Sequence, residues 1–383
     1  MPENPALVCE NKCIYAWNIR LYITFFIQRD TIRAQFRANA AFFSDGIARG
    51  RLSCYHDGTV KKGGKRDAVQ RMGRPARIGH RLWQRGVRRQ GPEGQARDFL
   101  DAYAALGGNF IDSARVYGDF ATPRDGESEK VIGRWLDGRR RGDIFLSTKG
   151  AHPRFSSMNV PRLSREEIMD DMRRSLEALR TDHVDIYWLH RDDVGRPVGD
   201  ILDTLNALMD EGLMRMVGVS NWTTARIREA NAWAAAHGLH GIDGNQPQLS
   251  LARQMRTGDP TLVVMDGEMA AMHLETGMSL APFSSQGRGF LSKWFELGEA
   301  GLPEGLKRDY MCPENREIYR RCLEVRAQTG LSVGAIALAW LTSQPFLVYP
   351  LCGASRLEQV EALEEAGDAT ITPEQRDYLR KLV

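Results

Sequence analysis

Cysteine is scarce and scattered in this chain of 383 residues, which contains only six of them. Cys9 and Cys13 form the only close pair, and no second pair completes the four-ligand pattern of a structural zinc site. The sequence also lacks the nucleophile elbow of serine hydrolases and any acidic or histidine cluster with metal-ligand spacing. We therefore predict no bound metal, and reduced thiols in a cytoplasmic protein rather than a disulfide framework.

Long apolar runs are also missing. The most apolar early stretch, residues 14–27, contains Asn18 and Arg20 and is shorter than the roughly 20 residues that a membrane-spanning helix needs. A secretory signal would begin with a basic segment, whereas Glu3 and Glu10 precede every apolar run here. We expect no membrane segment and no membrane partner.

The chain has little net charge, since 52 lysines and arginines face 49 acidic residues, but the balance is uneven. Residues 1–95 carry 18 basic and 7 acidic side chains, and the remainder carries 34 and 42. A basic front could be an arm for nucleic acid or for a membrane. No folded nucleic-acid-binding motif accompanies it, so we interpret it as a solvated, poorly ordered extension and predict no nucleic-acid partner.

From about Gly91 onward the sequence alternates regularly between strand-like and helix-like segments. A helix-like stretch at 93–106 is followed by seven strand-like runs, each with a helix-like segment after it. Such alternation is typical of βα units around a parallel sheet. The strand-like runs lie near 109–113, 143–148, 184–189, 214–219, 241–246, 279–284 and 346–352. The helix-like segments lie near 127–137, 165–180, 199–211, 223–237, 261–276, 314–342 and 355–366, with a last short helix near 373–381.

Seven such units need one more strand to close an eight-stranded barrel. The segment that should supply it, from Arg71 to Arg89, has seven arginines and no acidic residue, whereas a barrel strand should be apolar. We therefore predict a (β/α)8 TIM barrel over residues 76–383 with a doubtful first strand. Residues 1–75 would be an atypical basic N-terminal extension. Two hypotheses for this front stay open, namely a disordered segment and a mis-called start, because an out-of-frame GC-rich message tends to be rich in arginine.

Polar residues of the kinds that catalysis uses follow one apolar run after another. Asp112 ends one strand, and Tyr117 lies five residues further on in a loop. Lys149 ends the next strand, and His190 follows the one after that. The carboxyl ends of all strands of a parallel barrel meet at one rim, where active sites lie. These four side chains are therefore expected to converge.

The chemistry that this set suits is proton delivery to a carbonyl oxygen. A phenol is a poor acid at neutral pH, with a pKa of about 10, and an ammonium group beside Tyr117 would stabilise its phenolate. Asp112 would hold the charge of Lys149 in place, and His190 would orient the substrate oxygen or help to pass the proton. Each residue alone has a structural explanation, such as a turn cap or a surface lysine, so the prediction depends on all four occurring together.

Several motifs occur in the order found in a known family. The stretch NFIDSARVYG followed by ESEKVIGRWL resembles the aldo-keto reductase signature, as do STKG, DIYWLHR, GVSNW, NQPQLSL and SSQGRGFL. These motifs cover about residues 95–366. The resemblance implies a (β/α)8 barrel that binds a nicotinamide dinucleotide without a Rossmann domain. It also implies that the catalytic residues are Asp112, Tyr117, Lys149 and His190, with Tyr117 as the proton donor.

The resemblance further implies where the cofactor binds. The residues matching those that hold the nicotinamide carboxamide are Ser220, Asn221 and Gln246. Phe283 falls where the family has an aromatic residue, more often tyrosine, against the nicotinamide ring. The pyrophosphate would lie along Ser284, Gln286, Gly287 and Arg288, and the adenosine 2′-phosphate would be held by Gly353, Ser355, Arg356 and Gln359. A helix N-terminus with an arginine is a favourable anion site, which favours NADP(H) over NAD(H).

Substrate selection should depend on loops at the rim, which we expect at 116–126, 150–164 and 286–312. The glycines and prolines of the last loop suit a mobile cover. Trp222 either faces the site or packs in the core, and both interpretations stay open. The neighbouring aromatic and aliphatic residues suggest a small-molecule aldehyde or ketone of modest size.

Two classes of function follow. The first is NADPH-dependent reduction of an aldehyde or ketone by a monomer or weak homo-oligomer, with hydride from nicotinamide and a proton from Tyr117. The alternative is a catalytically impaired barrel that binds nicotinamide nucleotide and has a regulatory or sensing role, which the unusual front would favour. A metal-dependent isomerase on the same fold lacks support, because rim carboxylates with metal-ligand spacing are absent from the sequence.

Overall fold

The computed structural model describes residues 22–24, 91–118, 125–354 and 356–382. At its centre is a sheet of eight strands in the order β7-β6-β5-β4-β3-β2-β1-β8. Neighbouring strands from β2 to β7 are all parallel. The strands are β1 (Tyr22–Thr24), β2 (Phe110–Asp112), β3 (Phe145–Gly150), β4 (Val184–Leu189), β5 (Met214–Ser220), β6 (Gly244–Gln246), β7 (Ser279–Leu280) and β8 (Leu351–Gly353).

Hydrogen bonds close this sheet on itself. The amide of Leu280 in β7 donates to the carbonyl of Leu347 (2.9 Å), and the amide of Tyr349 donates to the carbonyl of Leu280 (2.7 Å). A parallel bridge also joins Leu280 to Val348, just before β8. The sheet is therefore a barrel, and the predicted (β/α)8 architecture is confirmed.

The place between β2 and β8 is held by an antiparallel strand. In β1, Tyr22 lies opposite both Asp112 of β2 and Gly353 of β8. The segment 71–89, where we looked for a parallel first strand, lies outside the described residues. The barrel thus differs from a regular (β/α)8 barrel in the direction of its first strand, and the division of the chain at residue 75 stays a prediction.

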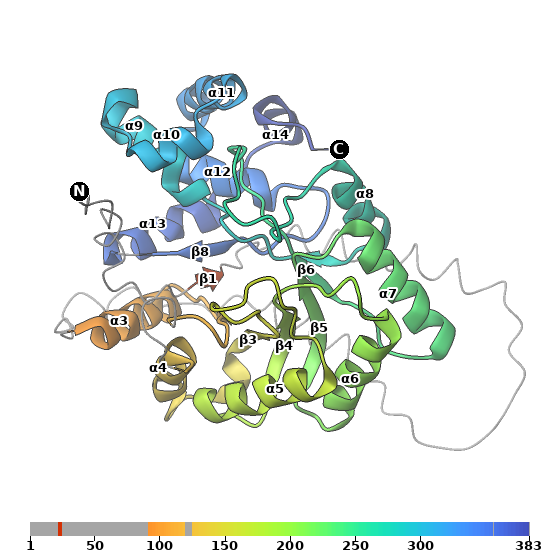
Figure 1. Cartoon of the computed structure of the whole chain (residues 1–383). Helices are drawn as coiled ribbons and strands as arrows, with labels where there is room; N and C mark the ends of the chain where they lie inside the picture. Colours follow the sequence, from red (N-terminus) through yellow and green to blue (C-terminus); the bar gives the residue numbers. More distant parts are fainter. Residues whose placement is uncertain (1–21, 25–90, 119–124, 355, 383) are drawn as a thin grey trace, which may run out of the picture.

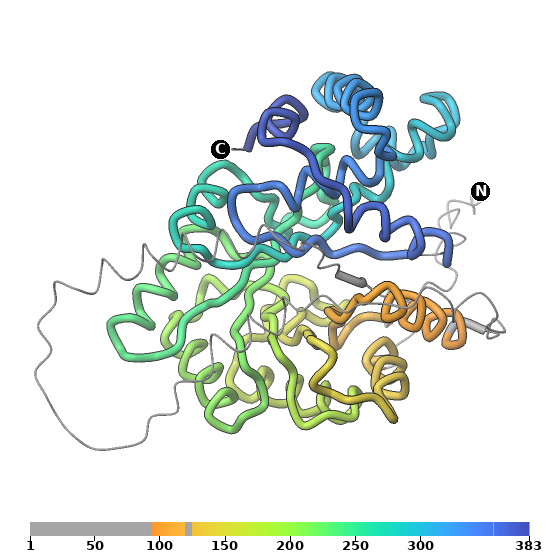
Figure 2. Tube along the Cα trace, turned by 180° about the vertical axis from the view of Figure 1, so that it is seen from behind, coloured from red at the N-terminus to blue at the C-terminus, as the bar shows by residue number. Residues whose placement is uncertain are grey.

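Helices surround the barrel, and α5, α6, α7 and α8 follow one another along one side of it (Figure 1). Seen from behind, the chain runs around the sheet until α13 lies beside α3, so the two ends of the described barrel meet (Figure 2). None of the described helices is long and apolar enough to cross a membrane. The helices are α3 (Gly91–Ala105), α4 (Glu127–Leu136), α5 (Arg165–Leu179), α6 (Val198–Asp210), α7 (Thr224–His237), α8 (Gly267–Thr276), α9 (Phe290–Gly301), α10 (Glu304–Tyr310), α11 (Pro313–Thr329), α12 (Val333–Thr342), α13 (Leu357–Asp368) and α14 (Pro373–Leu379).

Two predicted helix boundaries are wrong. The helix expected over 314–342 is two helices, because Gly330 in the left-handed region (φ 75°) ends α11 and the Ser332 hydroxyl caps the start of α12. The helix expected from residue 261 begins only at α8, where the Asp266 side chain accepts a hydrogen bond from the Met269 amide (2.8 Å).

The segment 286–312, which was predicted to be a loop at the rim, is largely helical. It contains α9 and α10, which pack firmly, since Phe290 and Tyr310 are fully buried and their rings stack with centroids 5.3 Å apart. These buried aromatic residues stabilise helices in a segment whose glycines and prolines would favour a loop.

The barrel interior is filled rather than open. Side chains from β2, β3, β4 and the segments after β7 and before β8 form one apolar cluster inside the sheet. Its members are Phe110, Phe145, Ile186, Trp188, Ala281 and Tyr349. Large interlocking side chains of this kind are typical of barrel cores. They leave only the rim at the carboxyl ends of the strands for chemistry.

Candidate active site

Asp112 and Lys149 form a buried ion pair where β2 and β3 end. The Lys149 ammonium donates to the Asp112 carboxylate and to the Ser113 carbonyl (2.7 Å). The other oxygen of Asp112 accepts from the Ser147 hydroxyl at 2.6 Å. Asp112 is fully buried and Lys149 is 2% exposed. Burial lowers the pKa of Lys149, and the adjacent carboxylate opposes that effect.

Tyr117 lies directly beside this pair. The Lys149 ammonium is 4.7 Å from the centre of the Tyr117 ring, which is close enough for a cation–π contact. Tyr117 is 9% exposed, and its amide donates to the Ala114 carbonyl in a tight turn (3.0 Å). The structure therefore brings together the phenol and the ammonium group that the sequence placed at successive strand ends.

His190 completes the set. Its ring meets that of Tyr117 edge to face, with centroids 5.8 Å apart, and its amide donates to the carbonyl of Gly150 at the end of β3 (2.9 Å). The His190 Nδ1 atom is buried and has no hydrogen-bond partner among the described residues. Burial, followed by the charges of His152, Arg191 and Lys149, holds the pKa of His190 well below its usual range. A neutral imidazole at this position can hydrogen-bond a carbonyl oxygen without adding a charge.

Three amide and hydroxyl side chains lie next to these residues. The Ser220 hydroxyl donates to the Gln246 carbonyl (2.8 Å), and the Asn221 amide group donates to the Ser220 hydroxyl (3.1 Å) and to the His190 carbonyl (3.2 Å). Asn221 adopts a left-handed backbone conformation (φ 62°), which asparagine tolerates better than most residues. Gln246 donates to Asp112 (3.1 Å), so the predicted carboxamide site adjoins the predicted catalytic residues.

Gln246 also has an unfilled hydrogen-bonding position. Its side-chain oxygen is buried and accepts no hydrogen bond from any described residue. An unpaired buried acceptor costs roughly 1–3 kcal/mol. The donor that it lacks is of the kind that a primary amide such as the nicotinamide carboxamide supplies.

The segment after β7 forms a loop with an unusual backbone. Phe283 is half-buried, and its backbone amide donates a hydrogen bond to the Pro247 carbonyl (3.1 Å). Ser284 and Arg288 both have positive φ angles, 53° and 56°, which only a few per cent of non-glycine residues adopt. Gln286 is half-buried and precedes Gly287, whose φ is 54°. Such backbone conformations concentrate at ligand-binding loops.

The predicted 2′-phosphate residues lie where β8 leads into α13. Gly353 and Arg356 are exposed, and Arg356 precedes the first turn of α13. The Gln359 side chain accepts from the Arg356 amide at 3.2 Å. Ser355 lies outside the described residues.

Lys293, in α9, adds a cation that the sequence analysis missed. Burial lowers the pKa of this half-buried lysine, and the positive charges of Arg288 and Arg356 lower it further. Three cations from α9, the loop before it and the start of α13 therefore share one electrostatic environment. A lysine five residues after a predicted phosphate-binding arginine, at the start of a helix, was a signal that could have revealed it.

His152, in the loop after β3, was also missed. Its ring lies 4.7 Å from that of His190 and 5.4 Å from that of Phe155. Its Nδ1 atom contacts the Pro153 carbonyl at 2.6 Å, and burial lowers its pKa to about 4.

Trp222 is 1% exposed and donates to the Arg191 carbonyl (3.3 Å), so its ring packs in the core.

A sequence profile of the Aldo/keto reductase family matches residues 79–383. The chain belongs to the aldo/keto reductase family. It is therefore an oxidoreductase of a family that acts on small carbonyl compounds and uses nicotinamide cofactors. The resemblance seen in the sequence motifs is confirmed.

Several relatives share most of their length with this aldo/keto reductase. A probable aryl-alcohol dehydrogenase of Saccharomyces cerevisiae is 28% identical over 303 residues, covering 76% of this chain and 88% of its own. A norsolorinic acid reductase of Aspergillus flavus is 26% identical over 298 residues, covering 76% and 72%. A probable voltage-gated potassium channel subunit beta of rice, Oryza sativa subsp. japonica, is 27% identical over 307 residues, covering 76% and 87%.

A solved structure supports the fold. A thermostable aldo-keto reductase, Tm1743, crystallised with the inhibitor epalrestat, superposes with a TM-score of 0.56 at 21% sequence identity. The match covers 77% of this chain and 89% of that one.

In the part of the chain that the structure describes, no group of three or more histidine, cysteine or acidic residues is arranged to hold a metal ion.

Proposed function

We propose that this protein reduces an aldehyde or ketone to an alcohol with NADPH, and that Tyr117 donates the proton. The observation that carries the proposal is the buried Lys149 ammonium, held by Asp112 and placed 4.7 Å from the Tyr117 ring. A cation in this place stabilises the phenolate that remains after Tyr117 has given up its proton. His190, kept neutral by burial, would hydrogen-bond the same substrate oxygen.

NADPH would supply the hydride for this reaction. The residues proposed to hold its carboxamide are Ser220, Asn221 and Gln246, and the unpaired buried oxygen of Gln246 supports that role. Phe283 would lie against the nicotinamide ring, and the pyrophosphate would lie along Ser284, Gln286, Gly287 and Arg288. The positive φ angles of Ser284, Gly287 and Arg288 support this, since such backbone conformations concentrate at ligand-binding loops.

We propose NADPH rather than NADH because cations gather where the extra phosphate would bind. The residues proposed to hold this phosphate are Gly353, Ser355, Arg356 and Gln359, of which Arg356 is exposed and directly precedes α13. Lys293 shares the electrostatic environment of Arg356 and Arg288. A doubly charged phosphate gains more from such a cluster than a ribose hydroxyl does.

The rings beside the site favour an aromatic substrate. From the rim inward, the rings of Phe155, His152, His190 and Tyr117 form a continuous series of contacts with centroids 4.7 to 5.8 Å apart. Phe155 is 45% exposed, and Val160 in the same loop is 51% exposed. An exposed apolar edge leading to a reactive centre suits a flat apolar substrate. The names of the aryl-alcohol dehydrogenase and norsolorinic acid reductase relatives support the same choice.

We also propose a cytoplasmic location and a monomer or weak homo-oligomer. The three cysteines that the structure describes, Cys312, Cys322 and Cys352, are all free thiols. Burial raises the pKa of Cys322 and Cys352 to about 12, which makes both thiols unreactive.

A second candidate is a nucleotide-binding subunit with a regulatory role. The observation that favours it is the similarity to proteins named as potassium channel beta subunits. The assembled pair of Asp112 and Lys149 beside Tyr117 favours the enzyme, and turnover decides between the two.

The test is NADPH oxidation by the purified protein with benzaldehyde, compared with a Tyr117→Phe variant. We expect turnover that falls by about 10²-fold or more in the variant, while NADPH binding, measured by fluorescence titration, stays the same. Wild-type turnover that Tyr117→Phe leaves unchanged would refute the assignment of the acid. Binding of NADPH without any turnover would favour the regulatory candidate.

A further inference from the structure

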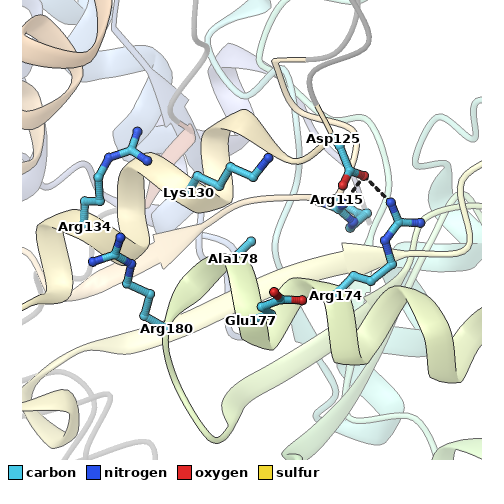
Figure 3. Close-up of a pocket in the computed structure, with 8 residues that line it drawn as sticks. All are labelled: Arg115, Asp125, Lys130, Arg134, Arg174, Glu177, Ala178 and Arg180. Carbon is cyan, nitrogen blue, oxygen red and sulfur yellow. Dashed lines mark hydrogen bonds and ion pairs between the residues drawn. The ribbon is translucent and has the colours of Figure 1, made fainter.

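A groove of about 390 Å³ opens between α4 and α5, outside the barrel (Figure 3). Five cationic side chains line it, but the four arginines among them already have acidic partners. Arg134 pairs with Glu93, Arg180 with Asp137, and Arg115 and Arg174 share Asp125. The lining residues are Arg115, Asp125, Lys130, Arg134, Arg174, Glu177, Ala178 and Arg180. These pairs form an ion-pair network that is largely exposed at the surface, and of its four arginines only Arg115 is buried.

The inner end of this network is Arg115, two residues before Tyr117. Arg115 is only 6% exposed, and its guanidinium reaches Asp125 and, at 3.2 Å, the carboxylate of Glu129 in α4. Figure 3 shows Asp125 between Arg115 and Arg174, so the network also reaches α5. The loop that carries Tyr117 is thus fixed from outside the barrel by its own arginine.

Glu129 is fully buried, and each of its carboxylate oxygens has a different task. One accepts from Arg115, and the other accepts from the Thr148 hydroxyl at 2.6 Å. Thr148 immediately precedes Lys149 in β3. A single buried carboxylate therefore bridges the loop of the phenol and the strand of the ammonium group.

The backbone around this bridge adds to the coupling. The Arg115 amide donates to the carbonyl of Lys149 (2.9 Å), and the Ser128 amide, at the start of α4, donates to the carbonyl of Tyr117 (3.1 Å). Gly126 allows the approach, because a Cβ atom at that position would lie 1.7 Å from Arg115 Nη1. The two backbone hydrogen bonds and the absence of a side chain at Gly126 thus accommodate the contact between Arg115 and Glu129.

We propose that Glu129 is a positioning residue, which fixes Tyr117 relative to Lys149 through its bonds to Arg115 and Thr148. This role rests on the proposed function, since it concerns the geometry of the same proton donor. Glu129 touches neither reacting group, and it acts by limiting how far the loop after β2 can move from the end of β3. Burial raises the pKa of Glu129, whereas the hydrogen bond from Thr148 and the charge of Arg115 lower it; in its charged form Glu129 also favours the ammonium form of Lys149.

The test replaces Glu129 by glutamine, which keeps the shape and removes the charge. With its oxygen toward Arg115, the glutamine would turn its NH2 group toward Thr148, so the hydroxyl would have to accept instead of donate, and the charge-assisted bond from Arg115 would become a weaker neutral one. We expect kcat for benzaldehyde reduction to fall about 10- to 100-fold, because a displacement of about 1 Å at a reacting group costs up to 10²-fold. The dissociation constant of NADPH should stay within about twofold, since the proposed cofactor residues lie on other elements.

Two further variants make the result decisive. Thr148→Val removes only the hydroxyl group, so it should fold even if Glu129→Gln does not, and we expect a smaller fall in kcat with unchanged NADPH affinity. Glu127→Gln is the matched control, two residues earlier in the same helix, where the carboxylate is 25% exposed and pairs with Arg134; its kcat should equal that of the wild type.

The outcomes separate the two proposals. Absence of wild-type turnover would refute the proposed function itself. Wild-type turnover with a kcat in Glu129→Gln and Thr148→Val within twofold of it would refute the positioning role. A parallel loss of NADPH affinity and kcat would also refute it, because general damage to the fold, rather than a displaced Tyr117, would then be the cause.

Discussion

Lys149 is a buried cation whose charge is balanced mainly by the carboxylate of Asp112. Its ammonium group has an ion pair with Asp112 and a hydrogen bond to the Ser113 carbonyl, and it is 2% exposed. A buried ion pair adds little stability compared with apolar residues of the same size, but removing one partner leaves an uncompensated charge. The pair is therefore better explained by chemistry at Tyr117 than by folding.

A mutation series at this pair tests that explanation. Lys149→Met should abolish turnover and lower the free energy of unfolding by about 3–5 kcal/mol, because Asp112 is left buried and unpaired. The double variant Lys149→Met/Asp112→Asn should recover part of the stability but none of the activity. Urea denaturation and the benzaldehyde assay measure the two quantities. A double variant no more stable than the single one would show that the unpaired charge is not the cause.

We propose that Arg356 decides the cofactor preference. Arg356→Ala should weaken NADPH binding by about 10-fold or more, since it removes one charged contact to a phosphate, and should change NADH binding little. Fluorescence titration with both nucleotides measures the effect. Arg228→Ala, which removes an exposed arginine that pairs with Glu275 of α8, serves as the control. Equal losses for NADPH and NADH in Arg356→Ala would exclude a contact with the 2′-phosphate.

At this scale the sequence predicted the residues that meet but not those that hold them. Asp112, Tyr117, Lys149 and His190 stand at strand ends, and the barrel topology alone brings such positions together. Glu129 was hidden, because within α4 it occupies a buried position that the helical pattern assigns to an apolar residue. An acidic residue on the apolar face of a helix, shortly after a catalytic loop, is the signal that sequence reasoning could have used.

At the scale of elements, some helix and strand boundaries follow from local sequence signals, whereas others depend on tertiary packing. The strands from β2 to β5 begin and end within two residues of the predicted runs, whereas β6 begins three residues later and β7 ends four residues earlier than predicted. The boundary at Gly330 was readable, because glycine followed by Ser332 is a helix stop and a helix start. The helices α9 and α10 could not be predicted in this way, since their stability comes from ring contacts between helices. One such contact joins Trp294 and Tyr319, whose ring centroids are 4.2 Å apart, and no local pattern reveals it.

The contact between α4 and α5 gives a prediction for a whole element. A Cβ atom at Gly133 would lie 2.3 Å from the carbonyl of Ala178, so the two helices can approach only over a glycine. Gly133→Ala should lower the free energy of unfolding by about 1–3 kcal/mol through overpacking, although alanine alone favours a helix by about 1 kcal/mol. Urea denaturation measures the change.

The matched control is Gly305→Ala in α10. The nearest atom to a Cβ atom there is Arg288 Nη2 at 3.6 Å, an ordinary contact. This variant should be as stable as the wild type or more stable, as helix propensity predicts. A stabilising effect of Gly133→Ala as well would show that the two helices can separate without loss, and that the ion-pair network between them is adjustable.

For the whole molecule, the topology was predictable and its closure was not. Alternating strand-like and helix-like segments specify a parallel sheet with helices around it. The three residues Tyr22–Thr24, which run antiparallel between β2 and β8, could not be identified, because so short a run has no pattern of its own. Residues paired across more than eighty positions of chain depend on the finished fold, and the sequence carries no local record of them.

Burial of histidines throughout the barrel gives a prediction about the stability of the whole protein. His152, His190 and His273 are each at most 8% exposed, and burial lowers the pKa of all three, that of His152 to about 4. In the unfolded chain these residues take up a proton near pH 6.5. As the pH falls below that value, the unfolded state binds protons that the folded state does not, so stability declines until the folded pKa is reached.

His273 allows this effect to be measured away from the active site. It lies in α8, where its Nδ1 atom contacts the carbonyl of Met278 at 2.8 Å. His273→Gln removes the titrating group, so the stability of this variant relative to the wild type should improve between pH 7.5 and pH 5, by at most about 2 kcal/mol. Urea denaturation at both values gives the difference, and charged groups common to both proteins cancel. A relative stability that does not change with pH would mean that His273 has the same pKa in the folded and the unfolded protein. Its burial in α8 would then not shield it from protonation.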